Sequence, residues 1–461
     1  MDKLKSDSAS DASKMNLLGL DDDCLLEILE NFDLFQLLNF RGICARFDNL
    51  INKCRFKFVN FNSKILSGNS GIDCEIFEFL GPVIKKLSLD RGHFTEEIDN
   101  LLLLEKIIKF CENLESLMFL NFDLSSKSVQ EKFRKIVEKL KFISFCNCIF
   151  KDDFGESFSE ATTLKELSIE ENHQITSKFF EKLSNLTSLS IVNCSKIKSK
   201  SLKMILKKKL TLKKLKICSH KPILDRTSIE FIVTNAENLE ELTTTANKID
   251  LLRLVDIPNL KKLSIISVGS KINKVTSLLE KLTKKNSIED LQIDFLHLLH
   301  MQLASKLTNL KKLKFHYWYG FTGDDLERTF SEDDWLSAND FFTMIRFLTK
   351  LEQLVVSTHF IDIGFLEKLE IFLMQTGDNR PKIEISFKKV MNNKSDETLY
   401  DLLDYLNGIK NFKISGIESP EDIYHVHRYL CYHKNNKIYY APYYEAGYPE
   451  NSSENSYISK V

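Results

Sequence analysis

Histidine and cysteine side chains gather near the end of the chain at spacings that metal ligands can adopt. His425, His427, Cys431 and His433 form an H-x-H-x3-C-x-H cluster, and imidazole nitrogens together with a thiolate are common ligands of zinc. The same stretch also fits a terminal helix with one apolar face. We favour the helix and predict no metal site.

The residue patterns that enzymes need are missing from the rest of the sequence. It contains no G-x-S-x-G, P-loop, H-E-x-x-H or C-x-x-C motif and no dinucleotide fingerprint, each of which would place a nucleophile, a phosphate cradle or metal ligands. The sequence therefore predicts a protein that is not an enzyme and that uses no cofactor.

A run of lysines could instead recognise another molecule. The segment from Lys196 to Lys216 contains ten lysines and no acidic residue, which would suit an acidic partner. We expect most of these lysines to lie on a solvated helix and its turns. Lys214 and Lys216 alternate with apolar residues of a strand, so these two are the candidates for contact with a substrate.

A second candidate group is aromatic. His316, Tyr317, Trp318 and Tyr319 follow one another where a strand is expected to end, and such side chains often anchor a binding partner. They precede an acidic segment, and we predict an insertion at about residues 318–340. Packing of this loop onto its neighbours remains the alternative to substrate binding.

Composition limits the cellular setting and the partners. The 461 residues carry a formal net charge of −1, which gives no general attraction to nucleic acid or to an anionic membrane. Residues 1–16 are polar, and no apolar run approaches the ~18 residues of a membrane span. We therefore expect a disordered tail at 1–16, reduced cysteines, and an intracellular protein of the cytoplasm, the nucleus or both.

The elements that position these side chains follow from a repeat. A frame of apolar residues at positions i, i+3 and i+5 recurs along most of the chain. Frames begin at Ile84, Leu114, Leu140, Leu164, Leu186, Leu212, Leu239, Leu260, Ile288, Leu310, Leu351 and Ile409, with a partial frame at Ile383 and Ile385. From Ile84 to Ile409 the mean step is about 27 residues, inside the range of leucine-rich repeats.

The spacing within each repeat predicts its structure. Positions i+3 and i+5 alternate with polar residues, which indicates a short strand with one buried face. Between frames the apolar period is helical, as for Leu202, Ile205 and Leu206. One strand and one helix cannot bury their own apolar faces, so we predict an α/β leucine-rich-repeat solenoid: a horseshoe with parallel strands inside and helices outside. An ordinary α/β domain with leucine-rich strands is the alternative.

The exposed strand positions are then i+2, i+4 and i+6. Position i+4 is a small hydroxyl residue in several frames: Ser88, Ser144, Ser168, Ser190, Thr243 and Ser264. Position i+2 mixes lysine with glutamate and aspartate. Alternating charge suits a protein segment better than a polyanion, so we expect a protein substrate, no nucleic acid and no membrane.

Residues 17–52 form a separate, strongly apolar unit. Asp21 or Asp22 can cap a first helix, Asp33 can cap a second, and a third is expected from about Ile43. Three helices of this size have little stability by themselves. Their apolar surface implies a partner or docking against the solenoid.

This unit resembles the F-box of insect-type sequences. The resemblance lies in L-x-D-D-C-L-L-E-I-L at residues 20–29 and R-x-x-C-x-R-F at residues 41–47. Asp21 stands where the family usually has proline, and Phe47 stands where it has a late tryptophan. In that family the motif docks on the adaptor subunit of a cullin–RING ubiquitin ligase. The resemblance implies these adaptor-facing residues: Leu20, Leu25, Ile28, Leu29, Phe32, Leu37, Leu38 and Cys44.

The repeats are similar to the cysteine-containing leucine-rich repeats of F-box proteins. The frame from Leu186 to Ile197 carries the Asn193-Cys194 pair, which recurs at Asn147-Cys148. Asn172 and Asn247 stand at the place of Cys194, where a thiol or amide can bond the turn backbone.

The resemblance implies a substrate-recognition subunit of such a ligase, monomeric within the complex. Its F-box would bind the adaptor and, through it, a cullin, while its repeats bind a protein substrate. The alternative is a repeat scaffold outside any ligase. We assign residues 53–82 to a linker or capping repeat, 83–418 to the solenoid, and 419–461 to a C-terminal helix with a tyrosine-rich tail.

Overall fold

The computed structural model describes residues 17–63, 75–93, 100–183, 185–207, 211–219, 224–245, 251–266, 272–295, 298–322, 335–376, 381–391, 405–406, 409, 412–415, 433–434 and 437–438. The chain divides into two units. The first comprises Met1–Asp294, Leu303–Leu313 and Leu348–Lys350, and the second comprises Phe295–Gln302, Lys314–Phe347 and Leu351–Val461. The expected tail at 1–16 lies outside the described residues, as does the expected C-terminal helix and tyrosine-rich tail at 419–461 except for residues 433–434 and 437–438.

Three helices open the first unit, as the sequence predicts. After the 3-10 segment η1 (Leu17–Gly19) come α1 (Asp22–Glu30), α2 (Leu34–Asn39) and α3 (Ala45–Cys54). The third helix starts later than expected, because Cys44 is its N-cap residue and Ile43 lies before it with 56% of its surface exposed. None of the described helices is long and apolar enough to cross a membrane.

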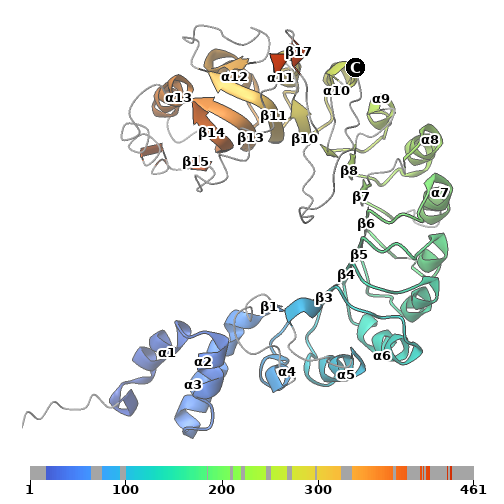
Figure 1. Cartoon of the computed structure of the whole chain (residues 1–461), viewed down its shortest axis with the longest axis vertical. Helices are drawn as coiled ribbons and strands as arrows, with labels where there is room; N and C mark the ends of the chain where they lie inside the picture. Colours follow the sequence, from blue (N-terminus) through green and yellow to red (C-terminus); the bar gives the residue numbers. More distant parts are fainter. Residues whose placement is uncertain are drawn as a thin grey trace, which may run out of the picture. The chain divides into compact units, whose positions relative to one another are not determined.

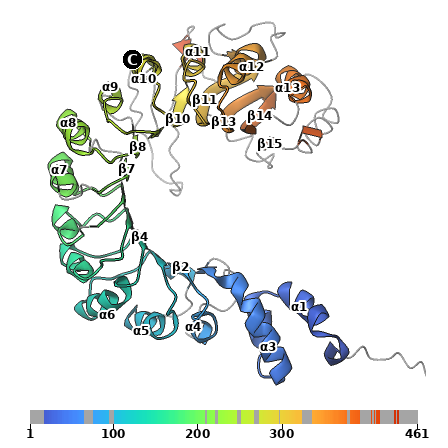
Figure 2. The same cartoon turned by 180° about the vertical axis from the view of Figure 1, so that it is seen from behind.

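The repeats of the first unit form one parallel sheet. Its strands follow one another in chain order: β1 (Asn60–Asn62), β2 (Lys86–Asp90), β3 (Ser116–Leu120), β4 (Phe142–Cys146), β5 (Glu166–Glu170), β6 (Ser188–Val192), β7 (Lys214–Cys218), β8 (Glu241–Thr245), β9 (Lys262–Ile266) and β10 (Asp290–Phe295). Within this unit the strands line the inner side of a curve and the helices the outer side (Figures 1 and 2). The predicted solenoid of parallel strands and outer helices is confirmed.

The register of the sheet explains why the apolar frame has a constant spacing. Position i+3 of each frame lies opposite position i+3 of the next, as Leu167 does with Leu189 and Leu189 with Leu215. These side chains and those at i+5 are buried. Each added repeat therefore extends one continuous core, to which a buried Leu or Ile contributes about 1.5–3 kcal/mol before chain entropy is subtracted.

The outer layer varies with repeat length. The α-helices are α4 (Glu75–Leu80), α5 (Asn100–Phe110), α6 (Lys127–Val137), α7 (Ser199–Lys207), α8 (Arg226–Asn235), α9 (Leu251–Leu254) and α10 (Ile272–Lys285), with 3-10 segments η5 (Asp152–Phe158) and η6 (Ser177–Phe180) between α6 and α7. In the two repeats that carry η5 and η6, a 3-10 helix takes the place of the α-helix and covers more length per residue than an α-helix does. In α7 the predicted apolar face is buried.

Phenylalanines fill the core beneath η5 and η6. The rings of Phe133 and Phe154 lie 5.0 Å apart between centroids, and those of Phe150 and Phe179 lie 5.5 Å apart. Gly155 lets η5 approach η6, because a Cβ atom at this residue would lie 2.4 Å from the carbonyl oxygen of Phe179. The compact 3-10 layer therefore depends on both large rings and one residue without a side chain.

The turns after the strands are stabilised by the predicted cysteine and asparagine positions. The Cys194 thiol donates to the carbonyl oxygen of Val192 at 3.4 Å, and the buried Asn172 amide donates to the carbonyl oxygen of Glu170 at 2.6 Å. Asn121, Asn147 and Asn193 follow their strands with positive φ, a conformation that asparagine tolerates better than most residues. Asn247 lies outside the described residues.

The segment between the helices and the first full repeat differs in part from its expected form. Residues Arg55–Phe58 form a 3-10 turn, η2, and only Asn60–Asn62 is strand, paired in parallel with β2. Phe58 and Phe61 are buried under the first repeat, but Phe56 is 62% exposed. The near-alternating positions of Phe56, Phe58 and Phe61 predict an irregular first strand in this segment. The strand is instead confined to Asn60–Asn62, and Phe56 lies in the turn, at the surface.

The second unit contains most of α11 (Leu298–Ala304) and most of β11 (Lys312–Thr322). It also contains β12 (Trp335–Ser337), α12 (Ala338–Phe347), β13 (Gln353–Asp362), α13 (Ile363–Thr376), β14 (Lys382–Met391) and β15 (Phe412–Ser415). Strands β13 and β14 pair in parallel from Gln353 to Asp362, and β15 adds to β14. Phe342 of α12 stacks on Phe372 of α13 at 4.5 Å. His433–Lys434 and Lys437–Ile438 form an antiparallel pair, β16 and β17.

Candidate interaction surfaces

Helix caps set the shape of the N-terminal helices. The carboxylate of Asp21 accepts the backbone N–H of Cys24 at 2.7 Å, and this hydrogen bond lowers the pKa of Asp21 below its usual value. Asp33 and Gln36 form a capping box at the start of α2, with bonds of 2.8 and 2.9 Å. Each cap supplies an acceptor for a backbone N–H that the first turn of a helix leaves without an intrahelical partner.

Arg46 joins the third helix to the first. Its Nε atom lies 2.7 Å from Oδ1 of Asp22, and its Nη2 atom donates to the carbonyl oxygen of Leu20 at 2.5 Å. The residues Leu20, Asp22 and Arg46 belong to the two sequence motifs noted above. The contacts of Arg46 with Asp22 and Leu20 therefore hold the start of α1 against α3.

The helical unit has its own core. Leu25, Leu29 and Leu37 are 0–1% exposed, so these three of the eight candidate adaptor-facing residues lie inside it. The other five are half-buried: Leu20, Ile28, Phe32, Leu38 and Cys44. These five are the ones whose side chains reach the surface.

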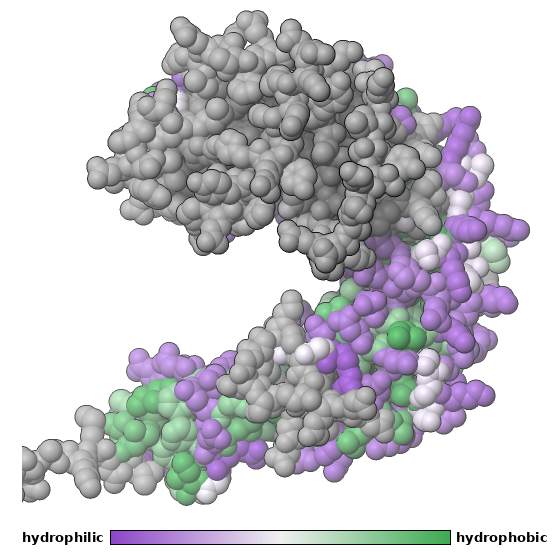
Figure 3. Space-filling model, viewed as in Figure 1, coloured by the Kyte–Doolittle hydropathy of each residue, from purple (hydrophilic) through white to green (hydrophobic). Residues whose placement is uncertain are grey.

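Further apolar side chains on this unit are more exposed than any of the eight candidates. Leu17, Ile43 and Phe56 are 43%, 56% and 62% exposed. Figure 3 shows apolar surface over the N-terminal helices, next to hydrophilic residues. Ile43 lies before α3 and Phe56 lies in η2, and in both places the turn brings the side chain to the surface.

The second candidate surface is the strand face, defined as positions i+2, i+4 and i+6 of β2 to β9. The i+4 residues of adjacent strands lie opposite one another. Examples of such pairs are Ser168 with Ser190, Ser190 with Lys216, and Lys216 with Thr243. Lys216 is therefore the one basic residue in a row that is otherwise small and polar on the adjacent strands. Its side chain is exposed.

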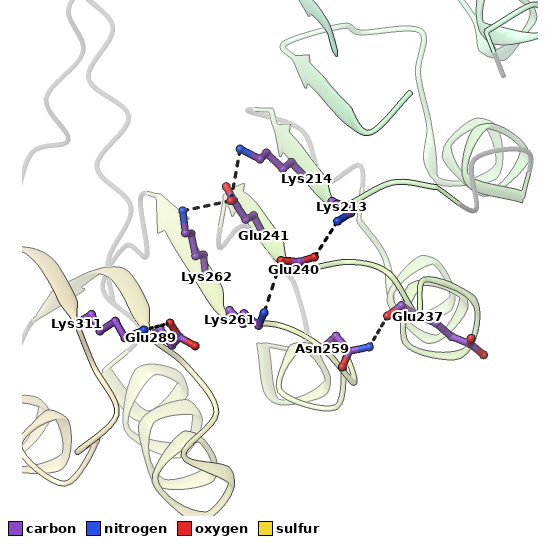
Figure 4. A network of polar contacts seen from close by, with 10 residues as sticks. All are labelled: Lys213, Lys214, Glu237, Glu240, Glu241, Asn259, Lys261, Lys262, Glu289 and Lys311. Atoms are coloured by element: carbon purple, nitrogen blue, oxygen red, sulfur yellow. Dashed lines mark hydrogen bonds and ion pairs between the residues drawn. The ribbon is translucent and has the colours of Figure 1, made fainter. Parts of the chain in front are cut away.

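Most charges at the end of the first unit neutralise one another (Figure 4). Glu241 lies between Lys214 and Lys262, with N···O distances of 3.5 and 3.2 Å. The residue before each of these forms a second set of ion pairs, in which Glu240 lies 3.4 Å from Lys213 and 3.7 Å from Lys261. Exposed pairs of this kind contribute at most about 1 kcal/mol each.

Acidic residues at β10 complete the series. The hydrogen bond from Lys311 to Glu289, 2.7 Å long, lowers the pKa of Glu289. Burial raises the pKa of Asp290, which Lys262 and Lys312 oppose. The lysines and acidic residues at position i+2 thus lie on the strand face, and several of them pair with one another, which the sequence did not predict.

The two lysines predicted to contact substrate are not equivalent. Lys214 is held by Glu241, whereas Lys216 makes no ion pair within the described residues. On β5, Glu166 and Glu170, with Glu171 just after the strand, likewise lack an ion pair among the residues that the structure describes. These carboxylates were not among the predicted substrate-binding residues. Glu166 and Glu170 could have been predicted, because positions i+2 and i+6 of the Leu164 frame lie on the strand face.

The charges of Lys216 on β7 and Glu170 on β5 both act on the thiol of Cys218. Burial raises its pKa, while Lys216 opposes that change and Glu170 adds to it. The cation of β7 and the carboxylate of β5 therefore act on the same small region of the strand face.

The aromatic candidates lie in the second unit. His316, Tyr317, Trp318 and Tyr319 are all part of β11, which extends to Thr322, rather than on its exit loop. His316 is half-buried, and residues 323–334 of the predicted insertion lie outside the described residues. Of the histidine and cysteine cluster, only His433 is described, and the described residues contain no group of metal ligands.

A comparison with protein families decides the nature of the helical unit. Residues 17–59 match the family model described as F-box domain. The chain carries an F-box domain. The match extends through η2, beyond the boundary at residue 52 that the sequence pattern indicates.

Similarity to individual proteins is weaker. No curated protein sequence matches the chain. Matching solved structures include an internalin (InlF) from Listeria monocytogenes, 16% identical over 76% of this chain and 90% of that chain, with a TM-score of 0.34. A complex of Rad7 and Elc1 in yeast matches with 16% identity over 73% and 88%, with a TM-score of 0.44. Both TM-scores are below 0.5, so neither likeness carries an argument.

The F-box domain is fastened to the first repeat. The guanidinium of Arg41 lies 4.8 Å from the ring centroid of Phe79 in α4, and Arg55 donates to the carbonyl oxygen of Phe79 at 3.3 Å. Within the domain, Lys57 donates to the carbonyl oxygens of Glu30 and Phe32. These contacts of Arg41 and of the η2 residues Arg55 and Lys57 make the junction a packed one.

Proposed function

We propose that this protein is a substrate-recognition subunit of a cullin–RING ubiquitin ligase, in which the F-box domain binds the adaptor and the repeats bind a protein substrate. The F-box domain is the single observation that carries this proposal. Domains of this family dock on adaptors linked to cullins. The protein would act by holding a substrate near the ubiquitin-conjugating enzyme, which raises the local concentration of reacting groups without any catalytic residue of its own.

The surface of the F-box domain supports a partner of this kind. Ile28 and Leu38 are half-buried on helices whose cores are already filled by leucines. Apolar surface of this sort on a small helical unit is typical of a protein interface. The packed junction through Phe79 would transmit a fixed geometry from the adaptor to the repeats.

Two observations favour a second candidate, a repeat scaffold outside any ligase. Phe47, where the family has tryptophan, is 2% exposed and stacks on Phe40 at 6.0 Å between ring centroids. Asp21, where the family has proline, is used as a helix cap. Both departures serve the internal structure of the domain, and a domain retained for its structure alone would show the same features.

Binding to the purified adaptor tests the proposal. The full chain is immobilised, and adaptor binding is measured for the wild type, for the Ile28→Asp, Leu38→Asp double variant, and for Leu102→Asp. Leu102 is a matched control because it is 44% exposed on α5, in the repeats. We expect binding by the wild type and the control, and at least about a tenfold loss in the double variant.

The double variant must show a circular dichroism spectrum and a thermal midpoint close to those of the wild type, so that its loss of adaptor binding is not due to unfolding. Absence of adaptor binding by the folded wild type at micromolar concentration would overturn the ligase proposal and leave the scaffold. Equal binding by the wild type and the double variant would show that Ile28 and Leu38 lie outside the interface.

A further inference from the structure

The strand face changes its chemistry from strand to strand within the first unit. On β3 it presents Met118 and Leu120, both half-buried, and the neighbouring β4 adds the half-buried ring of Phe142. On β5 it presents Glu166 and Glu170. An apolar region is therefore followed directly by an acidic strand.

The next two strands complete the sequence of chemistries. On β6 the face consists of the hydroxyls of Ser188 and Ser190, with Val192 buried. On β7 it presents Lys216, whose neighbour Lys214 is already bound to Glu241. The order along the face is apolar, acidic, small and polar, then basic.

The separation of these charges keeps them from neutralising one another. Strands β5 and β7 are separated by β6, and neighbouring strands lie about 4.8 Å apart, so the two rows are roughly 10 Å apart. Lys214 and Glu241, on adjacent strands, do pair. Glu170 and Lys216 have no such neighbour and make no ion pair within the described residues, so both charges are available to another molecule.

The spacing of strands β3, β5 and β7 matches the side-chain period of a polyproline II helix. Strands β3, β5 and β7 succeed one another at intervals of roughly 10 Å across the face. A polyproline II helix has three residues per turn and rises about 3.1 Å per residue, so every third side chain points the same way at intervals of roughly 9 Å. A segment of this kind lying across the strands would place successive third residues over β3, β5 and β7.

We propose that the strand face of β3, β5 and β7 binds an extended protein segment that carries an apolar, a basic and an acidic side chain at three-residue intervals. The apolar side chain packs on Met118 and Leu120, the basic one pairs with Glu166 or Glu170, and the acidic one pairs with Lys216. As a description of the substrate, the inference rests on the proposed function; the binding itself requires no adaptor. The serines of β6 lie beneath the segment and offer hydroxyls to its backbone.

Selection of peptides from a random library displayed on phage tests this surface. The full chain is used as bait in three forms: the wild type, Lys216→Glu, and Lys200→Glu as a control. Lys200 is exposed on α7 in the outer layer, so the control makes the same change of charge away from the strand face. If Lys216→Glu fails to fold, Lys216→Gln replaces it.

We expect the wild type and the control to enrich peptides with the apolar-x-x-basic-x-x-acidic pattern, read in one or the other chain direction. With Lys216→Glu the acidic position should change to a basic one. The synthetic wild-type peptide should bind Lys216→Glu at least about tenfold more weakly than the control. With Lys216→Gln, enrichment for an acidic residue should disappear.

Two results would overturn the inference: enriched peptides without this pattern, or enrichment that is the same for Lys216→Glu and for Lys200→Glu. Adaptor binding is measured on the same preparations. Loss of the peptide pattern with adaptor binding retained refutes only the docking surface, whereas peptide selection without adaptor binding refutes only the ligase.

Discussion

The side-chain oxygen of Asn172 accepts the backbone N–H of Cys148 at 3.1 Å and so links the turns of two successive repeats. The amide nitrogen of Asn172 donates to the carbonyl oxygens of Phe145 and Glu170 at 3.2 and 2.6 Å. One side chain that is 1% exposed thus satisfies three backbone groups.

Replacing this residue should therefore destabilise the repeats strongly. Asn172→Ala leaves buried backbone groups without partners, which we expect to lower the free energy of unfolding by about 2–3 kcal/mol. The shift of the urea midpoint measures the loss. Asn235→Ala, at an exposed residue near the end of α8, should change it by less than about 0.5 kcal/mol; equal shifts would contradict a special role for Asn172.

The contact between η5 and η6 should tolerate no added methyl group at Gly155. A Cβ atom there would lie 2.4 Å from the carbonyl oxygen of Phe179, so Gly155→Ala must displace backbone at a cost of about 1–3 kcal/mol. At Gly92 a Cβ atom would meet only Oδ1 of Asp90, at 3.5 Å. Thermal midpoints of the two alanine variants provide the comparison, and an unchanged midpoint for Gly155→Ala would refute the close approach.

Buried thiols should make the protein less stable at high pH. Burial raises the pKa of Cys111 from 9.0 to about 12, with Lys139 opposing. As the pH rises, the unfolded chain loses this proton first. The contribution of Cys111 is therefore intact below about pH 9 and is lost as the pH rises toward about 12.

Replacing Cys111 should flatten this dependence. Urea midpoints of the wild type and of Cys111→Ala are compared at about pH 7, where their difference reports packing alone, and at about pH 10. We expect the wild type to lose more stability over this interval than Cys111→Ala does. Identical slopes would show that the thiol does not titrate differently in the folded and unfolded chains.

Lys214 and Lys216 should contribute unequally to the binding of the selected peptide. Lys214 must leave Glu241 before it can bind another carboxylate, whereas Lys216 has no ion pair to break within the described residues. We expect Lys216→Ala to weaken the peptide by about fivefold and Lys214→Ala by less than about twofold. Fluorescence anisotropy gives both values, and a larger effect at Lys214 would reverse the assignment.

The repeat fold could be predicted closely because it depends on local pattern. The frame at i, i+3 and i+5 places one buried stripe on every strand, as Leu189 and Ile191 do in β6, and a stripe of this kind can be buried only by stacking neighbours. The helix cap at Asp33 was predictable for the same reason, since it bonds a backbone N–H three residues later. For the first helix the sequence left Asp21 and Asp22 open, and the structure shows Asp21 as the cap.

Surface residues of the F-box domain were less predictable. Leu25, Ile28 and Leu29 have the spacing of one helix face, but that spacing does not determine that Leu25 and Leu29 are buried in the domain's own core while Ile28 is half-buried. Phe56 was expected in a strand, and the 3-10 turn exposes it. Such choices depend on how α1, α2 and α3 pack, which no single stretch of sequence contains.

The sequence by itself determined the helical unit, the repeats and the residues on each strand's open side, because these follow from periodicities of two and of about 3.6 residues along the chain. Only the tertiary structure decided which charges remain available. Lys214 is neutralised by Glu241 and Lys216 is not, because ion pairs form between neighbouring strands whose register brings together residues distant in sequence.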